Sequence, residues 1–237
     1  MKNLLYVIAV FAIVSCGKKK SDFVSNPEDY NKYLIAETIP ATSKHFELWN
    51  SKIKPDSTQL LSFSNVAGEY NSFFKKTGNI EYLKKAEQVL LKAVEIANIN
   101  KASYRRALAR NYISQHRFKE ALLLTKEAEE IRGGKKETQS LFFDVYMELG
   151  NYTKAEKYLD SIKNMSDFGY LIRIAKWNDY KGDLDITIKY MEKAMKKAES
   201  SKNKTLLLWS YSNIADYYGH AGRIKDSYRY YLKNIRT

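Results

Sequence analysis

The stretch Ser103–Ile131, SYRRALARNYISQHRFKEALLLTKEAEEI, decides the fold of this chain. It predicts two short amphipathic helices joined at Gln115-His116-Arg117, because residues three and four apart share one face of a helix. The shared faces carry Leu108, Ala109 and Tyr112 in the first helix and Ala121, Leu122, Thr125 and Ala128 in the second. Isolated helices below about 12–15 residues are marginal in water. The pair must therefore pack on neighbours that repeat the same pattern.

The same pattern recurs along the chain at a nearly constant period. The small residue of the second helix recurs at spacings of 35, 34, 32 and 40 residues, at Ala86, Ala121, Ala155, Thr187 and Ser227. A ring or its substitute precedes each of these positions, at Phe74, Tyr112, Tyr146, Asn178 and Tyr218. A turn residue follows each ring four residues later, at Gly78, His116, Gly150, Gly182 and Gly222. Small residues allow two helices to cross closely, and the rings fill the space between successive pairs.

This pattern resembles the tetratricopeptide repeat (TPR), a helix pair of about 34 residues with Leu-small-x-x-Tyr in its first helix and Ala-x-x-x-aromatic in its second. The resemblance covers residues 58–237 and implies an all-α, right-handed α-solenoid of five antiparallel helix pairs, at 58–97, 102–131, 137–162, 166–199 and 204–235. Three copies depart from it, by extra residues before Ala86, by Asn178 with Thr187, and by Ser227. The only prolines are Pro27, Pro40 and Pro55, and no period-two alternation predicts strands.

The N-terminal region divides into three parts ahead of the repeats. Residues 1–15 are typical of a signal peptide, since the apolar run Leu4–Val14 is about half as long as a membrane span. It ends in Ile13-Val14-Ser15-Cys16-Gly17, which resembles the lipobox of bacterial lipoproteins and implies lipidation of Cys16, the only cysteine. Residues 16–26 then form a lipidated tether. Residues 27–57 are expected to be a degenerate N-terminal helix pair, and the chain ends without a capping helix.

This resemblance implies a Bacteroidota-like TPR lipoprotein anchored in the bacterial cell envelope, on the outer or inner membrane. The basic residues Lys18, Lys19 and Lys20 after the cysteine favour the periplasmic face over the cell surface. The net charge of +13 indicates either an acidic or phosphate-bearing partner, or simply solvated helix faces, and the sequence leaves both interpretations open. Nucleic acid does not fit the predicted location.

The sequence predicts neither catalysis nor a cofactor or metal. Its histidines, His45, His116 and His220, lie in unrelated helix pairs, and no metal-binding, nucleophile or phosphate-loop motif is present. The sequence Gly133-Gly134-Lys135 resembles part of a phosphate loop, but it follows a predicted helix and is interpreted as an interhelix turn.

The family geometry implies a ligand groove on the concave face, lined by the first helix of each pair. The candidate groove residues are Lys75, Lys76, Arg106, Arg110, Asp144, Lys176, Tyr180 and Asp216. Arg106 and Arg110 are four residues apart and so share a helix face. They are expected either to hold one carboxylate of a ligand or to pair with Asp144 or Glu148 of the next helix.

The leading functional hypothesis is a non-catalytic scaffold that holds a peptide segment or a partner protein in this groove. The alternative is a glycan- or nutrient-binding helical-repeat lipoprotein, which resembles this chain in its anchor and its repeats. That alternative needs exposed aromatic platforms, whereas most of the 19 tyrosines that can be placed are packing residues.

Overall fold

The computed structural model describes residues 23–34, 42–54, 56 and 58–237. In these residues all the regular structure is helical and no strand occurs. Two 3-10 turns come first, η1 (Pro27–Asp29) and η2 (Asn31–Tyr33), followed by the short helix α2 (Lys44–Asn50). The longer helices are α3 (Leu60–Thr77), α4 (Glu81–Ile96), α5 (Lys101–Ser114), α6 (Phe118–Ile131), α7 (Lys135–Glu148), α8 (Tyr152–Ser161), α9 (Phe168–Tyr180), α10 (Leu184–Ser201), α11 (Lys204–His220) and α12 (Ile224–Arg236).

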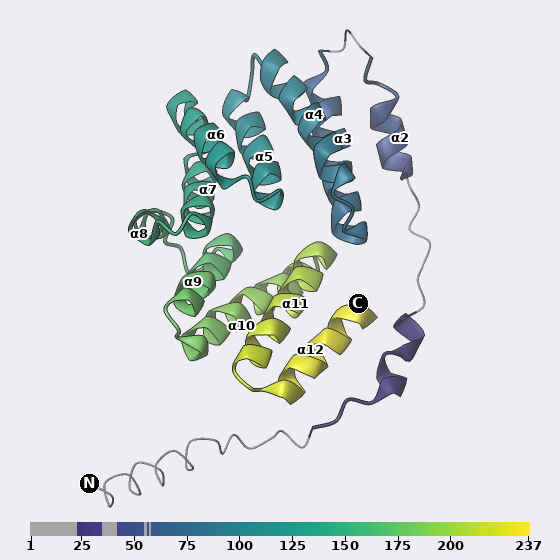
Figure 1. The fold of residues 1–237 in the computed structure, drawn as a ribbon, viewed down its shortest axis with the longest axis vertical. Coiled ribbons are helices and arrows are strands. Elements are labelled where there is room, and N and C mark those ends of the chain that lie inside the picture. Colours follow the sequence, from purple (N-terminus) through teal and green to yellow (C-terminus); the bar gives the residue numbers. More distant parts are fainter. Residues whose placement is uncertain (1–22, 35–41, 55, 57) are drawn as a thin grey trace, which may run out of the picture.

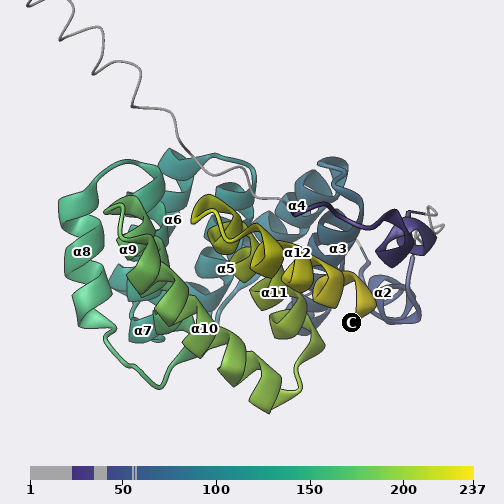
Figure 2. The same ribbon diagram turned by 90° about the horizontal axis from the view of Figure 1, so that it is seen from below.

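Helices α3 to α12 form consecutive antiparallel pairs that follow one another around a curved arc (Figure 1). Figure 2 shows the same ribbon turned by 90°, with α11 and α12 in the foreground. The predicted all-α stack of helix pairs is confirmed.

The residues that define the period are the ones that hold the pairs together. Tyr112 and Tyr146 are only 8% and 6% exposed, and Ala121 and Ala155 are fully buried. One hydrophobic cluster joins Ala67 of α3 to Tyr112 and continues to Val145 of α7, so it crosses three successive pairs. Burial of apolar surface stabilises a fold by about 25 cal/mol per Å². A single short pair buries too little of this surface to be stable, and stacking buries more.

The region before the repeats differs from the predicted helix pair. Only α2 is a helix there, begun by the Ser43 hydroxyl, which accepts a hydrogen bond from the Phe46 amide at 2.9 Å. It packs on α3 through Phe46, which lies in a cluster with Val66 and Phe73. The part beginning at Pro27 forms 3-10 turns, because each of its two segments is only three residues long and ends on i→i+3 bonds.

These 3-10 turns lie against the other end of the chain. The Tyr228 hydroxyl of α12 donates to Asp29 Oδ2 at 3.0 Å and accepts from the Asn26 amide at 3.2 Å. The Phe23 ring packs edge-on to Tyr228, with ring centroids 5.1 Å apart, and Arg236 pairs with Asp29 at 3.3 Å. We call residues 23–33 the N-terminal strap, because they come early in the chain and lie beside its last helix, α12 (Figure 1).

The signal peptide, Cys16 and most of the tether lie outside the described residues. Within the residues that are described, none of the helices combines the length and the apolar character needed to cross a bilayer.

Candidate functional site

A cleft of about 420 Å³ opens between the first helices of the last three pairs, α7, α9 and α11. The cleft is lined by Asp144, Ile172, Arg173, Lys176, Asp179, Trp209, Asn213 and Tyr217. All of these residues come from first helices of pairs, as the repeat geometry requires of a concave surface.

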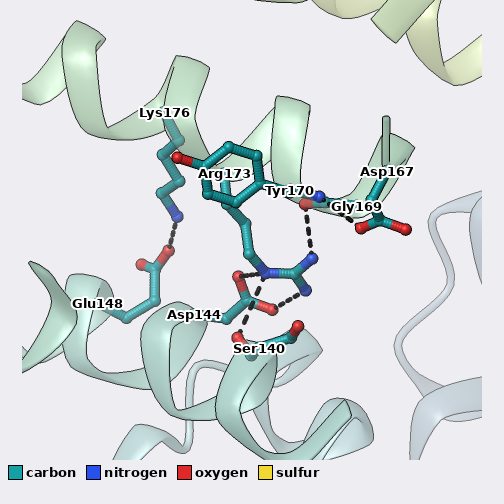
Figure 3. Close-up of polar contacts among 8 residues, drawn as sticks. All are labelled: Ser140, Asp144, Glu148, Asp167, Gly169, Tyr170, Arg173 and Lys176. Carbon is teal, nitrogen blue, oxygen red and sulfur yellow. Dashed lines mark hydrogen bonds and ion pairs between the residues drawn. The ribbon is translucent and has the colours of Figure 1, made fainter. Parts of the chain in front are cut away.

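One wall of the cleft is fixed by a two-pronged ion pair between α9 and α7 (Figure 3). Arg173 Nε and Nη2 donate to the two carboxylate oxygens of Asp144, at 3.0 and 2.5 Å. Nε also approaches the Ser140 carbonyl at 3.3 Å, and Nη1 donates to the Gly169 carbonyl at 2.9 Å. Such bidentate pairs define the geometry of both partners. The charge of Arg173 is therefore neutralised within the protein, and its orientation is fixed by these contacts.

Lys176 is likewise neutralised by an ion pair within the protein. Its Nζ lies 2.5 Å from Glu148 Oε1, one helical turn from the Arg173–Asp144 pair. The sequence reading that Arg106 or Arg110 pairs with Asp144 or Glu148 is therefore wrong, because these two carboxylates already bind Arg173 and Lys176.

The opposite wall of the cleft is formed by α11 and carries two aromatic side chains, Trp209 and Tyr217, with Asn213 between them. Trp209 on α11 is 40% exposed, and its ring packs edge-on to Phe168 with centroids 5.9 Å apart. Burial, and then the charges of Asp179 and Asp216, raise the pKa of Tyr217 to about 12, so its phenol stays protonated at neutral pH. Asp179 makes no side-chain hydrogen bond or ion pair with the residues described. The cleft thus combines an exposed indole, a neutral phenol and a carboxylate available to a ligand.

Arg110 of α5 supplies an unpaired positive charge on the same concave side. It is exposed to solvent and makes no hydrogen bond or ion pair within the described chain. Desolvation by the surrounding protein lowers the pKa of Arg110, and the charge of Arg106 lowers it further, while the charge of Asp144 acts in the opposite direction. Arg110 does not belong to the cleft lining, but its charge interacts with those of Asp144 and Arg173, which do.

Arg106 has a different position from the one predicted. It is 8% exposed, and its Nη1 donates to the Gly133 carbonyl at 2.8 Å and to Thr138 Oγ1 at 3.2 Å. Its guanidinium lies so close to Gly134 that a Cβ there would come within 2.5 Å of Nη2. Arg106 and Arg110 therefore do not act together on one carboxylate, since Arg106 is used at the α6–α7 turn.

The remaining predicted groove residues lie outside the cleft lining. Tyr180 stacks on Tyr152 of α8, with centroids 3.8 Å apart, and Asp216 accepts a hydrogen bond from the Tyr231 hydroxyl of α12. Lys75 and Lys76 are exposed in the last turn of α3, where cations are favoured by the helix dipole.

Sequence reasoning missed the α11 side of the cleft by one residue of helical register. It placed Asp216 in the groove, whereas Trp209, Asn213 and Tyr217 line it. Ser212, one residue before Asn213, accepts a hydrogen bond from Asn234 of α12 at 2.8 Å. The spacing of Trp209, Asn213 and Tyr217, four residues apart, is the signal that marks this face.

Comparison with known proteins supports the fold and leaves the function open. No protein-family model matches the sequence, and no curated protein matches it. Two crystal structures of nearly identical TPR-like repeats from a putative kinesin light chain of Podosopora anserina are similar at TM-scores of 0.48 and 0.47. They are 16% and 15% identical, over 76% and 77% of this chain and 93% and 96% of theirs.

A third solved structure is more similar in fold. It is a signal transduction ATPase with numerous domains from Pyrococcus horikoshii, which carries a tetratricopeptide repeat sensor. The TM-score is 0.59 at 22% identity over 91% of this chain, which spans about a third (34%) of the length of that protein. Together with the buried repeat residues, this likeness defines the fold as a TPR-like helical repeat.

Proposed function

We propose that this protein is a non-catalytic scaffold whose concave face binds a segment of a partner protein. The observation that carries the proposal is the cleft between α7, α9 and α11, where a large indole stays 40% exposed between charged side chains. Exposed aromatic residues in a concave site are typical anchors for a bound side chain. TPR-like repeats in general bind peptide segments on this face, which supports the same interpretation.

The charges of the cleft specify the kind of segment it fits. Arg173 and Lys176 are neutralised by Asp144 and Glu148, which leaves Asp179 as a lining charge without a partner among the described residues. Arg110 of α5, outside the lining, is a nearby cation that is also unpaired in the described part of the chain. An acidic side chain fits Arg110, and an apolar or aromatic side chain fits Trp209 and Tyr217. A backbone amide or a lysine fits Asp179. We infer that the ligand is a peptide carrying an acidic residue and an apolar one.

A random peptide library displayed on phage tests the proposal without knowledge of the natural partner. We expect selection on the wild-type protein to enrich peptides that combine an acidic and an apolar residue. Arg110→Glu and Trp209→Ala should each weaken binding of an enriched peptide by about tenfold or more, the effect of losing one well-placed contact. The matched controls are Lys126→Glu and Leu123→Ala on α6, which are exposed and lie outside the cleft.

Two outcomes would contradict the proposal. One is an absence of enrichment over a library selected on an empty support. The other is a peptide whose affinity falls equally in the cleft variants and in the α6 controls. A glycan-array signal that is lost in Trp209→Ala, with no peptide enriched, would replace it with the glycan-binding alternative.

We further propose that the scaffold is a lipoprotein of the bacterial cell envelope, anchored through Cys16. The support is the sequence Leu4–Cys16, an apolar run that ends at the only cysteine. Wild-type protein expressed in a bacterium should incorporate an alkyne-bearing fatty acid and partition into detergent, whereas Cys16→Ser should do neither. Equal labelling of the two proteins would contradict the anchor without affecting the cleft proposal.

A further inference from the structure

A second pocket lies away from the concave cleft, where the α4–α5 connection meets the α6–α7 turn. Its volume is about 390 Å³. The polar residues of its lining include Asn98, Lys101, Ser103, Arg106 and Arg132, and no aspartate or glutamate belongs to that lining. Three cations around a small pocket, without a carboxylate, form an uncompensated positive site.

None of the three cations forms an ion pair with the described residues. Lys101 and Arg132 make no side-chain ion pair with the described residues. Arg106 is more than nine-tenths buried, and only its Nη1 donates hydrogen bonds, to Gly133 and Thr138. Nε and Nη2 of Arg106 have no acceptor in the part of the chain that the structure describes. Neither nitrogen is among the fully enclosed atoms of the described chain, so both donors are accessible to a ligand in the pocket.

Backbone groups add to the same pocket. Helix α5 begins at Lys101 with no side-chain cap, because Asn100 adopts a left-handed conformation and its side chain bonds none of the first amides. The first amides of a helix carry partial positive charge and bind anions when left uncapped. The Ser103 amide already donates to the Asn100 carbonyl at 2.8 Å, so the amides without a backbone partner in the described chain are those of Lys101 and Ala102. The Ser103 hydroxyl, two residues into the helix, is a further donor without a partner among the described residues.

The geometry points to a phosphate site: we propose that this pocket binds a phosphate dianion or a phosphomonoester. Buried Arg106 and exposed Lys101 and Arg132 supply the charge, and the Ser103 hydroxyl with the Lys101 and Ala102 amides supplies neutral donors. Guanidinium groups match phosphate oxygens in pairs, whereas a carboxylate in the lining would repel them. This proposal is independent of the concave cleft, with which the pocket shares no lining residue.

The test is a titration of the purified full chain with inorganic phosphate, followed by amide chemical shifts. The Lys101, Ala102 and Ser103 amides should shift and saturate, and chloride at the same ionic strength should not reproduce the shift. Lys101→Gln should weaken binding by about tenfold, as expected when one charged contact is lost. Lys126→Gln, an exposed α6 lysine outside the pocket, is the matched control and should leave the affinity unchanged.

Arg132 offers a variant that separates binding from folding. Its backbone has φ 65° and ψ 175°, a region that glycine occupies without strain. Arg132→Gly should therefore raise the melting temperature while lowering phosphate affinity. A higher melting temperature with unchanged affinity would show that Arg132 is not a ligand and would overturn its role here.

Two further probes identify the source of the phosphate group. Glycerol 3-phosphate should compete with inorganic phosphate for the same amides. Binding to vesicles containing phosphatidic acid, without any response to either soluble probe, would overturn the proposal in favour of general attraction to an anionic surface. The absence of amide shifts with both soluble probes and vesicles would overturn it as well.

Discussion

A single backbone angle decides each of the tight turns within the helix pairs. Gly78, Gly150, Gly182 and Gly222 all have positive φ, between 68° and 79°, and His116 occupies the equivalent turn with φ 57°. The left-handed conformation costs a residue with a Cβ roughly 1–2 kcal/mol, and glycine almost nothing. Glycine recurs at this repeat position because the turn requires a left-handed backbone conformation. His116 adopts the same conformation under strain.

Substitutions at Gly150 and at His116 should change the free energy of unfolding in opposite directions. Gly150→Ala should lower the free energy of unfolding by about 1–2 kcal/mol. No atom lies within 4 Å of the new Cβ, so the effect would come from the backbone alone. His116→Gly should raise the free energy of unfolding by about 0.5–1 kcal/mol, less what is lost with the His116–Phe118 ring contact. Urea unfolding measures both, and a loss of stability in His116→Gly would contradict the strain.

Among whole helices, the close crossing within a pair depends on the small residue of the second helix. Ala155 of α8 is fully buried in a cluster with Phe143 and Tyr146 of α7. Ala155→Leu should lower the free energy of unfolding by about 1–3 kcal/mol, because extra methylene groups overpack such a site. Thr153→Leu, on an exposed position of the same helix, should change it by less than about 0.5 kcal/mol. Similar losses in both variants would contradict the close crossing.

One carboxylate ties a helix to the turn of the next pair. Glu87 of α4 accepts hydrogen bonds from Gln115 Nε2 at 2.9 Å and from Arg117 Nη1 at 2.7 Å. Burial alone would raise the pKa of Glu87, but these hydrogen bonds and the charge of Arg117 lower it overall. Because the folded pKa is below the unfolded one, the stabilisation is present above the unfolded pKa, near about 4.3, and is lost as pH falls through the folded pKa.

Glu87→Gln should therefore have an effect that depends on pH. At pH 7 we expect a loss of about 1 kcal/mol, a modest value because Arg117 is partly exposed. As pH falls below about 4.3 and through the lowered folded pKa of Glu87, the difference from wild type should shrink, since Glu87 then becomes protonated and is uncharged like glutamine. The control is Glu81→Gln, whose ion pair with Lys84 is exposed on both sides and should contribute little at any pH. A difference that persists undiminished into acid would show that the Glu87 charge is not responsible.

Helix pairs were predictable from the sequence because the same small residues, rings and glycines recur in register. The cleft was less predictable, since a groove position depends on helix rotation, and a shift of one residue exchanges Asp216 for Tyr217. Arg106 illustrates a different limit. Its spacing from Arg110 is that of a ligand clamp, yet a contact with Gly133, 27 residues away, takes its guanidinium into the protein.

At the scale of the whole molecule, the N-terminal strap gives the stack a contact that no repeat period encodes. In a simple solenoid each pair touches only its neighbours, so the last pair is free to fray. Here Asp29 binds both Tyr228 and Arg236 of α12, about 200 residues further along the chain. The 3-10 turns around Asp29 were predicted as part of a degenerate helix pair over residues 27–57, and a local sequence signal cannot reveal a partner so distant.

Loss of the strap should loosen the last pair alone. In Asp29→Ala and in Tyr228→Phe, amide hydrogen exchange should become faster in α12 and in residues 26–33. Exchange in α5 and α6, measured in the same sample, serves as the internal control and should not change, because those helices do not contact the strap. Faster exchange throughout the chain would indicate general destabilisation, and no change in α12 would show that the strap does not hold it.

The strap also bears on how the protein would face a bilayer. Phe23, at the start of the strap, follows Cys16 by seven residues, which can span at most about 25 Å of extended chain. If a lipid is attached at Cys16, Phe23 must stay within that distance of the membrane surface, and the part of α12 around Tyr228 stays near it while Tyr228 holds the strap. Helix α12 carries Lys225, Arg229 and Arg236 on exposed positions, which suits a negatively charged leaflet. The last repeat would then be the one nearest the lipid, although the anchor belongs to the opposite end of the sequence.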